Sequence, residues 1–100
     1  MRLGRVIGNV WATRKEEGLQ GLKLLIVQPI DAYGKAVRTH FVAADRIGAG
    51  KGDHVLVTSG GSSRFIDKDN PIPIDAVIIG IIDSTEVERG EFGGTSNWND

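Results

Sequence analysis

The sequence contains no cysteine among its 100 residues, which excludes a disulfide framework and any thiolate metal site. Aromatic side chains are also scarce, and the charges nearly cancel, with 12 Lys and Arg against 13 Asp and Glu. A nucleic-acid binder needs a basic surface with stacking aromatics, and an anionic membrane attracts a basic excess. The composition therefore argues against nucleic acid and membranes as partners.

Long apolar runs are absent as well. The N-terminal stretch MRLGRVIGNVWATRKEEG lacks the apolar core of a signal peptide, and no segment has the length needed to cross a bilayer. Together with the missing cysteines, this predicts a soluble domain in the cytoplasm. One hundred residues suffice for a single compact domain with a modest core.

The apolar residues occur in short runs rich in Val and Ile, separated by Gly, Asp, Pro and Ser, which is typical of strands. No window shows a sustained helical stripe; one helical turn over Ser62–Ile66 is the most that we expect. We predict an all-β fold, a small five-stranded OB-like barrel, because closure removes the exposed edges of a small sheet. The predicted strands are Leu3–Trp11, Leu22–Ile30, Ala36–Ala44, Asp53–Ser59 and Asp75–Asp83.

Two connecting features complete this organisation. The stretch DAYGK joins the second and third predicted strands as a hairpin, with Gly34 available for a positive φ. The domain is predicted to span residues 1–87. Residues 88–100 are polar and aperiodic and are expected to form a flexible tail, in which the aromatic side chain of Trp98 could dock on a neighbouring surface.

Two predicted strands carry apolar side chains on both faces. Leu25 and Val27 in the second strand alternate with Leu24 and Ile26, and the fifth strand, DAVIIGIID, has apolar side chains on both of its faces. Only one face of each can line a barrel, and each aliphatic side chain left outside forgoes roughly 1.5–3 kcal/mol. We therefore predict self-association through these faces. The alternative is that loops or the tail of the same chain cover them.

The glycine-rich stretch GAGKGD invites a phosphate-binding interpretation that the spacing does not support. A P-loop has glycine five residues before its last glycine and a hydroxyl after the lysine, but these positions hold Asp45 and Gly52. The dinucleotide fingerprint requires glycine at Asp53. A strand follows instead of a helix, so we predict a tight turn built on positive φ and no cofactor.

The stretch SGGSSR supports no strong catalytic prediction. A nucleophile elbow centred on Ser62 would need glycine where Arg64 stands, and neither His40 nor His54 has a spacing that marks it as the base. Scattered aspartates and two histidines give no metal-ligand spacing, so no metal site is predicted. The small polar residues could instead line a narrow opening for polar solutes, or form an ordinary capped turn.

Taken in order, three segments resemble the EutN/CcmL family of bacterial microcompartment vertex proteins. They are MRLGRVIGNVWATRKEEGLQGLKLLIVQPID, VAADRIGAGKGDHVLVTSGGSSR and PIDAVIIGIID, which cover about residues 1–87. The resemblance implies a non-enzymatic structural protein in the carboxysome-type shell. A homopentameric ring of such proteins caps each vertex, and hexameric shell proteins are its other partners. It brings no catalytic residue and no cofactor.

The resemblance also assigns candidate positions. It places Gly48, Ala49 and Gly50 at the family's turn and Ser59–Arg64 near the subunit interface and the central opening. The predicted interface residues are Leu25, Val27, Gly48, Ala49, Gly50, Arg64, Ile79 and Ile81, and the predicted residues of the opening are Ser59, Gly60, Gly61, Ser62 and Ser63. The alternative functions are an OB-like binding module for single-stranded nucleic acid or a small ligand and, more remotely, a hydrolase using Ser62 or Ser63.

Overall fold

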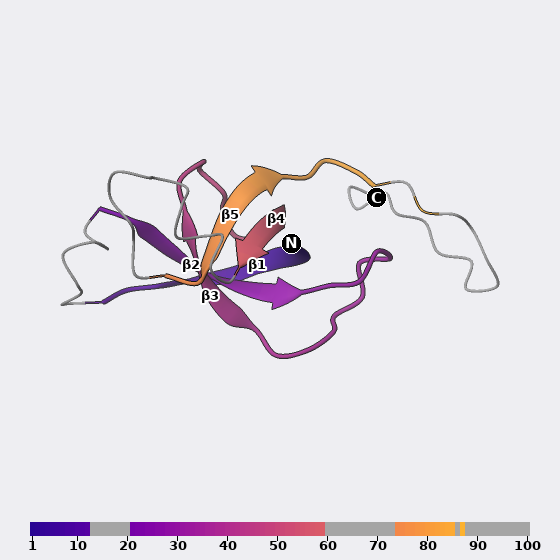
Figure 1. Cartoon of the computed structure of the whole chain (residues 1–100), viewed down its shortest axis with the longest axis horizontal. Coiled ribbons are helices and arrows are strands. Elements are labelled where there is room, and N and C mark those ends of the chain that lie inside the picture. Colours follow the sequence, from indigo (N-terminus) through magenta and orange to yellow (C-terminus); the bar gives the residue numbers. More distant parts are fainter. Residues whose placement is uncertain (13–20, 60–73, 86, 88–100) are drawn as a thin grey trace.

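The computed structural model describes residues 1–12, 21–59, 74–85 and 87. Within them the chain forms five strands that close into one barrel (Figure 1). The strands are β1 (Arg2–Val10), β2 (Lys23–Pro29), β3 (Phe41–Asp45), β4 (His54–Ser59) and β5 (Ala76–Ile81).

The barrel has the strand order β1-β2-β3-β5-β4, and β4 closes it by pairing with β1. All neighbours are antiparallel except β3 and β5, which run parallel. This mixed, closed arrangement confirms the all-β, five-stranded, OB-like prediction. The described part of the chain contains no helix, and so none that could span a membrane. The predicted turn at Ser62–Ile66 and the tail 88–100 lie outside the described residues.

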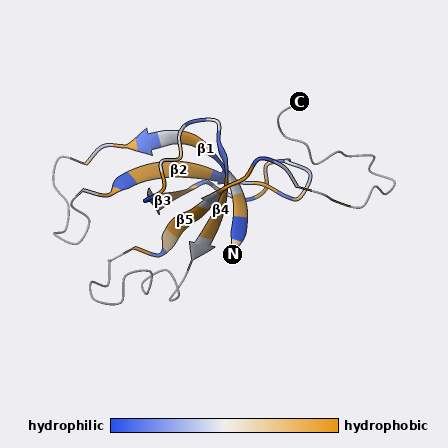
Figure 2. Ribbon diagram, turned by 90° about the horizontal axis from the view of Figure 1, so that it is seen from above, coloured by the Kyte–Doolittle hydropathy of each residue, from blue (hydrophilic) through white to orange (hydrophobic). Residues whose placement is uncertain are grey.

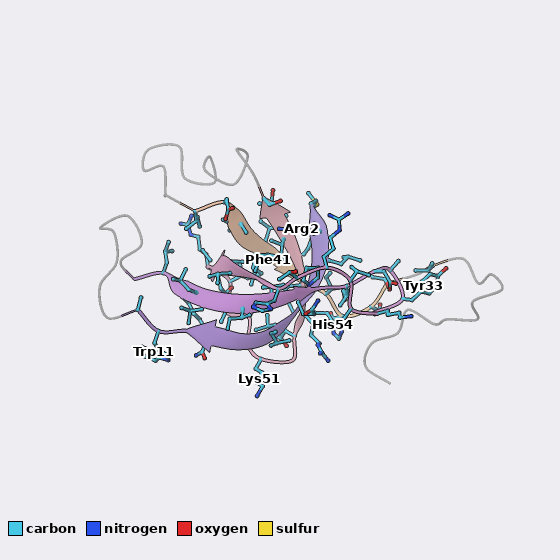
Figure 3. The ribbon with its side chains drawn as sticks, turned by 90° about the horizontal axis from the view of Figure 1, so that it is seen from below. Arg2, Trp11, Tyr33, Phe41, Lys51 and His54 are labelled. Carbon is cyan, nitrogen blue, oxygen red and sulfur yellow. The ribbon has the colours of Figure 1, made fainter. Side chains whose placement is uncertain are left out.

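All five strands contribute side chains to one core. The cluster of buried residues consists of Val6, Leu25, Val27, Ala43, Ala49, Val55, Val57, Ala76 and Ile78, with Phe41 packed against it. Ala49 is its only member outside a strand and comes from the turn between β3 and β4. Near Phe41 the guanidinium carbon of Arg2 lies 4.0 Å from the centre of the aromatic ring, a cation–π contact (Figure 3).

Two bulges interrupt the alternation of inward and outward side chains. In β1, Val6 pairs with Val27 and Gly8 with Ile26, which leaves Ile7 without a partner on β2. In β5, Ile78 pairs with Val57 and Gly80 with Leu56, which leaves Ile79 without a partner on β4. An extra residue of this kind bends the strand and increases its twist, as a small barrel requires.

The third strand is shorter than predicted, because residues 36–40 do not join the sheet as a ladder. Ala36 forms only an isolated bridge with Ile30, and Arg38 has a φ of 60°, in the left-handed region. The side-chain amide of Gln28 donates hydrogen bonds to the carbonyls of Val37 (3.3 Å) and Arg38 (3.0 Å). These contacts hold the segment as a loop, and β3 begins only at Phe41.

The predicted hairpin turn is present at Asp31–Lys35. Gly34 has a φ of 83°, as expected, and its N–H donates to the carbonyl of Asp31 (3.0 Å). The Asp31 carboxylate accepts hydrogen bonds from the backbone N–H groups of Tyr33 (2.9 Å) and Lys35 (3.0 Å). An Asx turn of this type fixes the chain reversal locally.

Candidate assembly surfaces

Strand β2 separates its two apolar faces cleanly. Leu25 and Val27 are 2% and 0% exposed and belong to the core cluster, so these two predicted interface residues face the inside of the barrel. The side of β2 that faces away from the core carries Leu24 and Ile26, which are half-buried. In the ladder with β3, Ile26 lies opposite Val42, which is 44% exposed.

Strand β5 does not separate its faces in this way. Its first three residues, Ala76, Val77 and Ile78, are all buried, so here the chain itself covers both sides of the strand. After Ile78 the bulge intervenes, and Ile79 and Ile81 are 39% and 43% exposed. In the part of the chain that the structure describes, Val77 is therefore covered by its own chain, whereas Ile79 and Ile81, both of them predicted interface residues, are exposed.

The GAGKGD stretch is a tight turn between β3 and β4, as predicted. Gly48 and Gly52 have φ values of 91° and 94°, which favour glycine. The amide of Gly50 donates to the Asp53 carboxylate (2.8 Å), and the amide of Gly52 donates to the carbonyl of Val6 (2.8 Å). With both amides engaged inside the protein, they are not available to cradle a phosphate.

The three predicted interface residues in this turn differ in accessibility. Ala49 is 0% exposed and belongs to the core, whereas Gly48 is exposed and Gly50 is half-buried. The turn is fixed from a second side by Lys23, whose ammonium donates to the carbonyl of Ala49 (2.8 Å). The surface that the turn offers to a neighbour is therefore made by its glycines and by Lys51, which lies on the outside (Figure 3).

Of the predicted residues in the polar segment Ser59–Arg64, the structure describes only Ser59. Ser59 ends β4, is half-buried and pairs with Ala76 of β5. The other predicted residues of the opening, Gly60, Gly61, Ser62 and Ser63, lie outside the described residues, as does Arg64. In the described part of the chain, no group of three His, Asp or Glu side chains could hold a metal ion.

Within the described residues, His54 is the titratable group whose pKa is clearly shifted. Burial lowers the pKa of His54 below its ordinary value of 6.5, and the positive charge of Arg5 lowers it further, while Asp53 opposes the shift. Arg5 is the residue opposite His54 in the β1–β4 ladder, which explains the proximity of the two charges. This arrangement accounts for the pKa without a catalytic role.

Sequence reasoning missed the outward residues of the β1–β2 end. Trp11 follows β1, is 90% exposed and stands at one end of the molecule (Figure 3). Val42 was also missed as an outward residue. The faces can be assigned only after the register of β2 with both neighbours is known, and no local signal in the sequence supplies it.

These features define a class of protein. The chain is a closed OB-like barrel that carries apolar side chains outside as well as inside, with hydrophobic residues along several of its strands (Figure 2). Residues 1–83 match the family model described as ethanolamine utilisation protein EutN/carboxysome. The chain belongs to this family.

Individual relatives extend over most of both chains. The carboxysome shell vertex protein CcmL of Synechococcus elongatus is 43% identical, over 89% of this chain and 90% of its own. The bacterial microcompartment shell vertex protein EutN of Salmonella typhimurium is 42% identical, over 83% and 84%. Among solved structures, the GrpN pentameric microcompartment shell protein from Rhodospirillum rubrum superposes with a TM-score of 0.78 at 39% identity, covering 88% of this chain and 99% of its own.

The resemblance read from the sequence is confirmed by these matches. The family is one of structural shell vertex proteins of bacterial microcompartments, and this chain is a member of it and not an enzyme.

Proposed function

We propose that five copies of this chain close into a ring that caps a vertex of a microcompartment shell, with hexameric shell proteins around it. The observation that carries the proposal is the pair of exposed isoleucines on β5, Ile79 and Ile81, in a chain similar to a pentameric shell protein. Apolar surface of this kind is stabilised when another subunit removes it from water.

The function of such a ring is geometric. In a cyclic assembly each copy presents one patch to the neighbour ahead and a different patch to the neighbour behind. Flat arrays of hexamers cannot close around a volume, and fivefold units supply the curvature that closes them. The near-neutral net charge of the chain, −1, keeps repulsion between identical subunits low.

Within this proposal, Ile79 and Ile81 belong to the subunit interface, together with Gly48, Gly50 and Arg64. What supports the first two is their exposure, Ile79 at the bulge and Ile81 after it. Leu25, Val27 and Ala49 contribute indirectly, since they form the core behind the interface. The segment Ser59–Ser63 is proposed to line the central opening, where small polar side chains would suit polar solutes.

Native mass spectrometry of the purified chain across micromolar concentrations tests the stoichiometry. We expect a five-copy species to dominate, and a lone monomer throughout that range would contradict the ring. Co-expression with a hexameric shell protein tests the second partner. Closed polyhedral particles should form with this chain and open sheets or tubes without it.

A further inference from the structure

Trp11 is the most exposed of the large apolar side chains in the described part of the chain. It is 90% exposed, compared with 78% for Met1 at the N-terminus and 47% for Ile47. A tryptophan offers about 150–250 Å² of surface for burial, and it is one of the residues most enriched at the energetic centres of protein interfaces. At 90% exposure, this side chain buries little apolar surface in the isolated barrel.

A hollow adjoins Trp11. It has a volume of about 460 Å³ and lies between the end of β1 and the start of β2. Its apolar walls come from Val10, Leu22 and Leu24, and Asn9 and Lys23 line it as well. An aliphatic side chain from outside would find apolar walls here, with an indole ring at the margin.

A second apolar surface lies on another side of the barrel. In the order β1-β2-β3-β5-β4, strand β5 neighbours neither β1 nor β2, so it lies across the barrel from their shared edge. Figure 2 shows β1 and β2 on one side of the barrel and β5 on the other. The exposed Ile79 and Ile81 therefore cannot fill the hollow of their own chain, and a neighbouring copy can bring its own pair to it.

We infer that Trp11 anchors the ring: the hollow beside it receives Ile79 and Ile81 of the next copy, and the indole packs over them. This inference rests on the proposed pentamer and names the two unlike patches that a heterologous interface needs. A second copy is the occupant because the chain is similar to a pentameric shell protein, and because β5 exposes aliphatic side chains that the hollow of the same chain cannot receive.

The chain offers a direct reporter, because Trp11 and Trp98 are its only two tryptophans. In a Trp98→Phe variant all tryptophan fluorescence comes from Trp11. On dilution from ring to monomer, we expect the emission to shift to the red and acrylamide quenching to increase, in step with the loss of the five-copy species in native mass spectrometry. A ring in which Trp11 stays fully open to acrylamide would overturn the inference and leave the pentamer intact.

Two variants test the contact itself. Trp11→Ser should raise the concentration at which the ring dissociates by about thirtyfold or more, as for an interface hot spot, with the melting of the dissociated monomer unchanged. Ile81→Ser should have a similar effect, and combining the two should cost clearly less than the product of the separate effects, because both remove one contact. Independent, multiplying effects would overturn the pairing.

The remaining outcomes each decide a different point. If the unmodified chain forms no ring, the proposed function fails and this inference fails with it. If Trp11 is protected already in the monomer, its own chain covers it and the inference is wrong. If protection requires an added hexameric shell protein, the occupant is that protein and not a second copy, which also overturns the inference.

Discussion

Strands β2 and β5 both carry apolar residues on two faces in the sequence, but the barrel buries these faces differently in the two strands. In β2 the alternation is kept: Leu25 is 2% exposed, and the outward Leu24 beside it is half-buried. In β5 both faces are buried up to Ile78, and the strand then bulges and exposes Ile79.

The difference shows that outward apolar residues can either stabilise the single chain or remain available for contact with another molecule. At the start of β5, burial of Val77 belongs to the stability of the single chain, since 99% of its surface is already covered without a partner. At the end of β5, the aliphatic side chains of Ile79 and Ile81 are 39% and 43% exposed and are available to another molecule. The bulge separates the buried part of β5 from its exposed part, and substitutions on the two sides of it test this division.

The largest effect is expected inside β2. Leu25→Ala should lower the free energy of unfolding of the monomer by about 2–5 kcal/mol, because it leaves a cavity in the core cluster. Leu24→Ala, on the opposite face of the same strand, should cost the monomer clearly less. Urea unfolding of both variants at concentrations below ring assembly measures this, and equal losses would mean that β2 does not separate its faces.

The next effect concerns the exposed end of β5. Ile79→Asp should leave the barrel folded, as judged by circular dichroism and the melting temperature, and should abolish the five-copy species because it puts a charge into the proposed interface. The matched variant Ile78→Asp, one residue earlier and 1% exposed, should unfold the chain. An intact ring in Ile79→Asp would remove β5 from the interface.

Smaller effects are expected from substituting two glycines of β1, which lie next to residues on opposite faces of β2. A Cβ added to Gly4 would overlap with Cγ1 of the buried Val27, so Gly4→Ala should cost about 1–3 kcal/mol by overpacking. A Cβ added to Gly8 would lie 3.6 Å from Cδ1 of Ile26, an ordinary contact, so Gly8→Ala should be tolerated. Thermal unfolding of the two variants gives the comparison, which fails if Gly8→Ala is the more damaging.

The smallest effect is expected from His54, which lies where β4 meets the end of β5. Its carbonyl accepts a hydrogen bond from the N–H of Ile82 (2.8 Å). Burial and Arg5 lower the pKa of His54, so the unfolded chain binds the proton more tightly than the folded one. Its contribution to stability is therefore complete above pH 6.5 and is lost as the pH falls through the lowered value. His54→Gln should flatten this part of the stability profile, and Arg5→Gln should flatten it in part. An unchanged slope in both would contradict the assignment.

Much of the fold could be predicted from the residues alone. The positions of the five strands follow from short Val- and Ile-rich runs between turn residues, and the turns at Gly34, Gly48 and Gly52 follow from the need for positive φ. The third strand was overextended to Ala36, because a run such as AVRTHF does not reveal that the Gln28 amide binds the carbonyl of Arg38 and holds that residue in a left-handed conformation.

The candidate surfaces were harder to predict. The predicted interface residues Ile79 and Ile81 are exposed, but the bulge in the pairing with β4 that accompanies this exposure is not visible in the sequence. In β2 the predicted interface residues are Leu25 and Val27, which the structure places in the core. Either face of an isolated strand with this composition could line the barrel, because the alternation of a strand has no absolute origin.

The sequence by itself determined the class of fold, the turns and the family, because these depend on local conformational preference and on the order of recognisable segments. Only the tertiary structure decided which side of each strand is inside. That choice depends on register with the neighbouring strands, and a shift of one residue exchanges the two faces. Which side chains an assembling barrel exposes therefore depends on strand pairing, and that pairing is determined by residues far apart in the sequence.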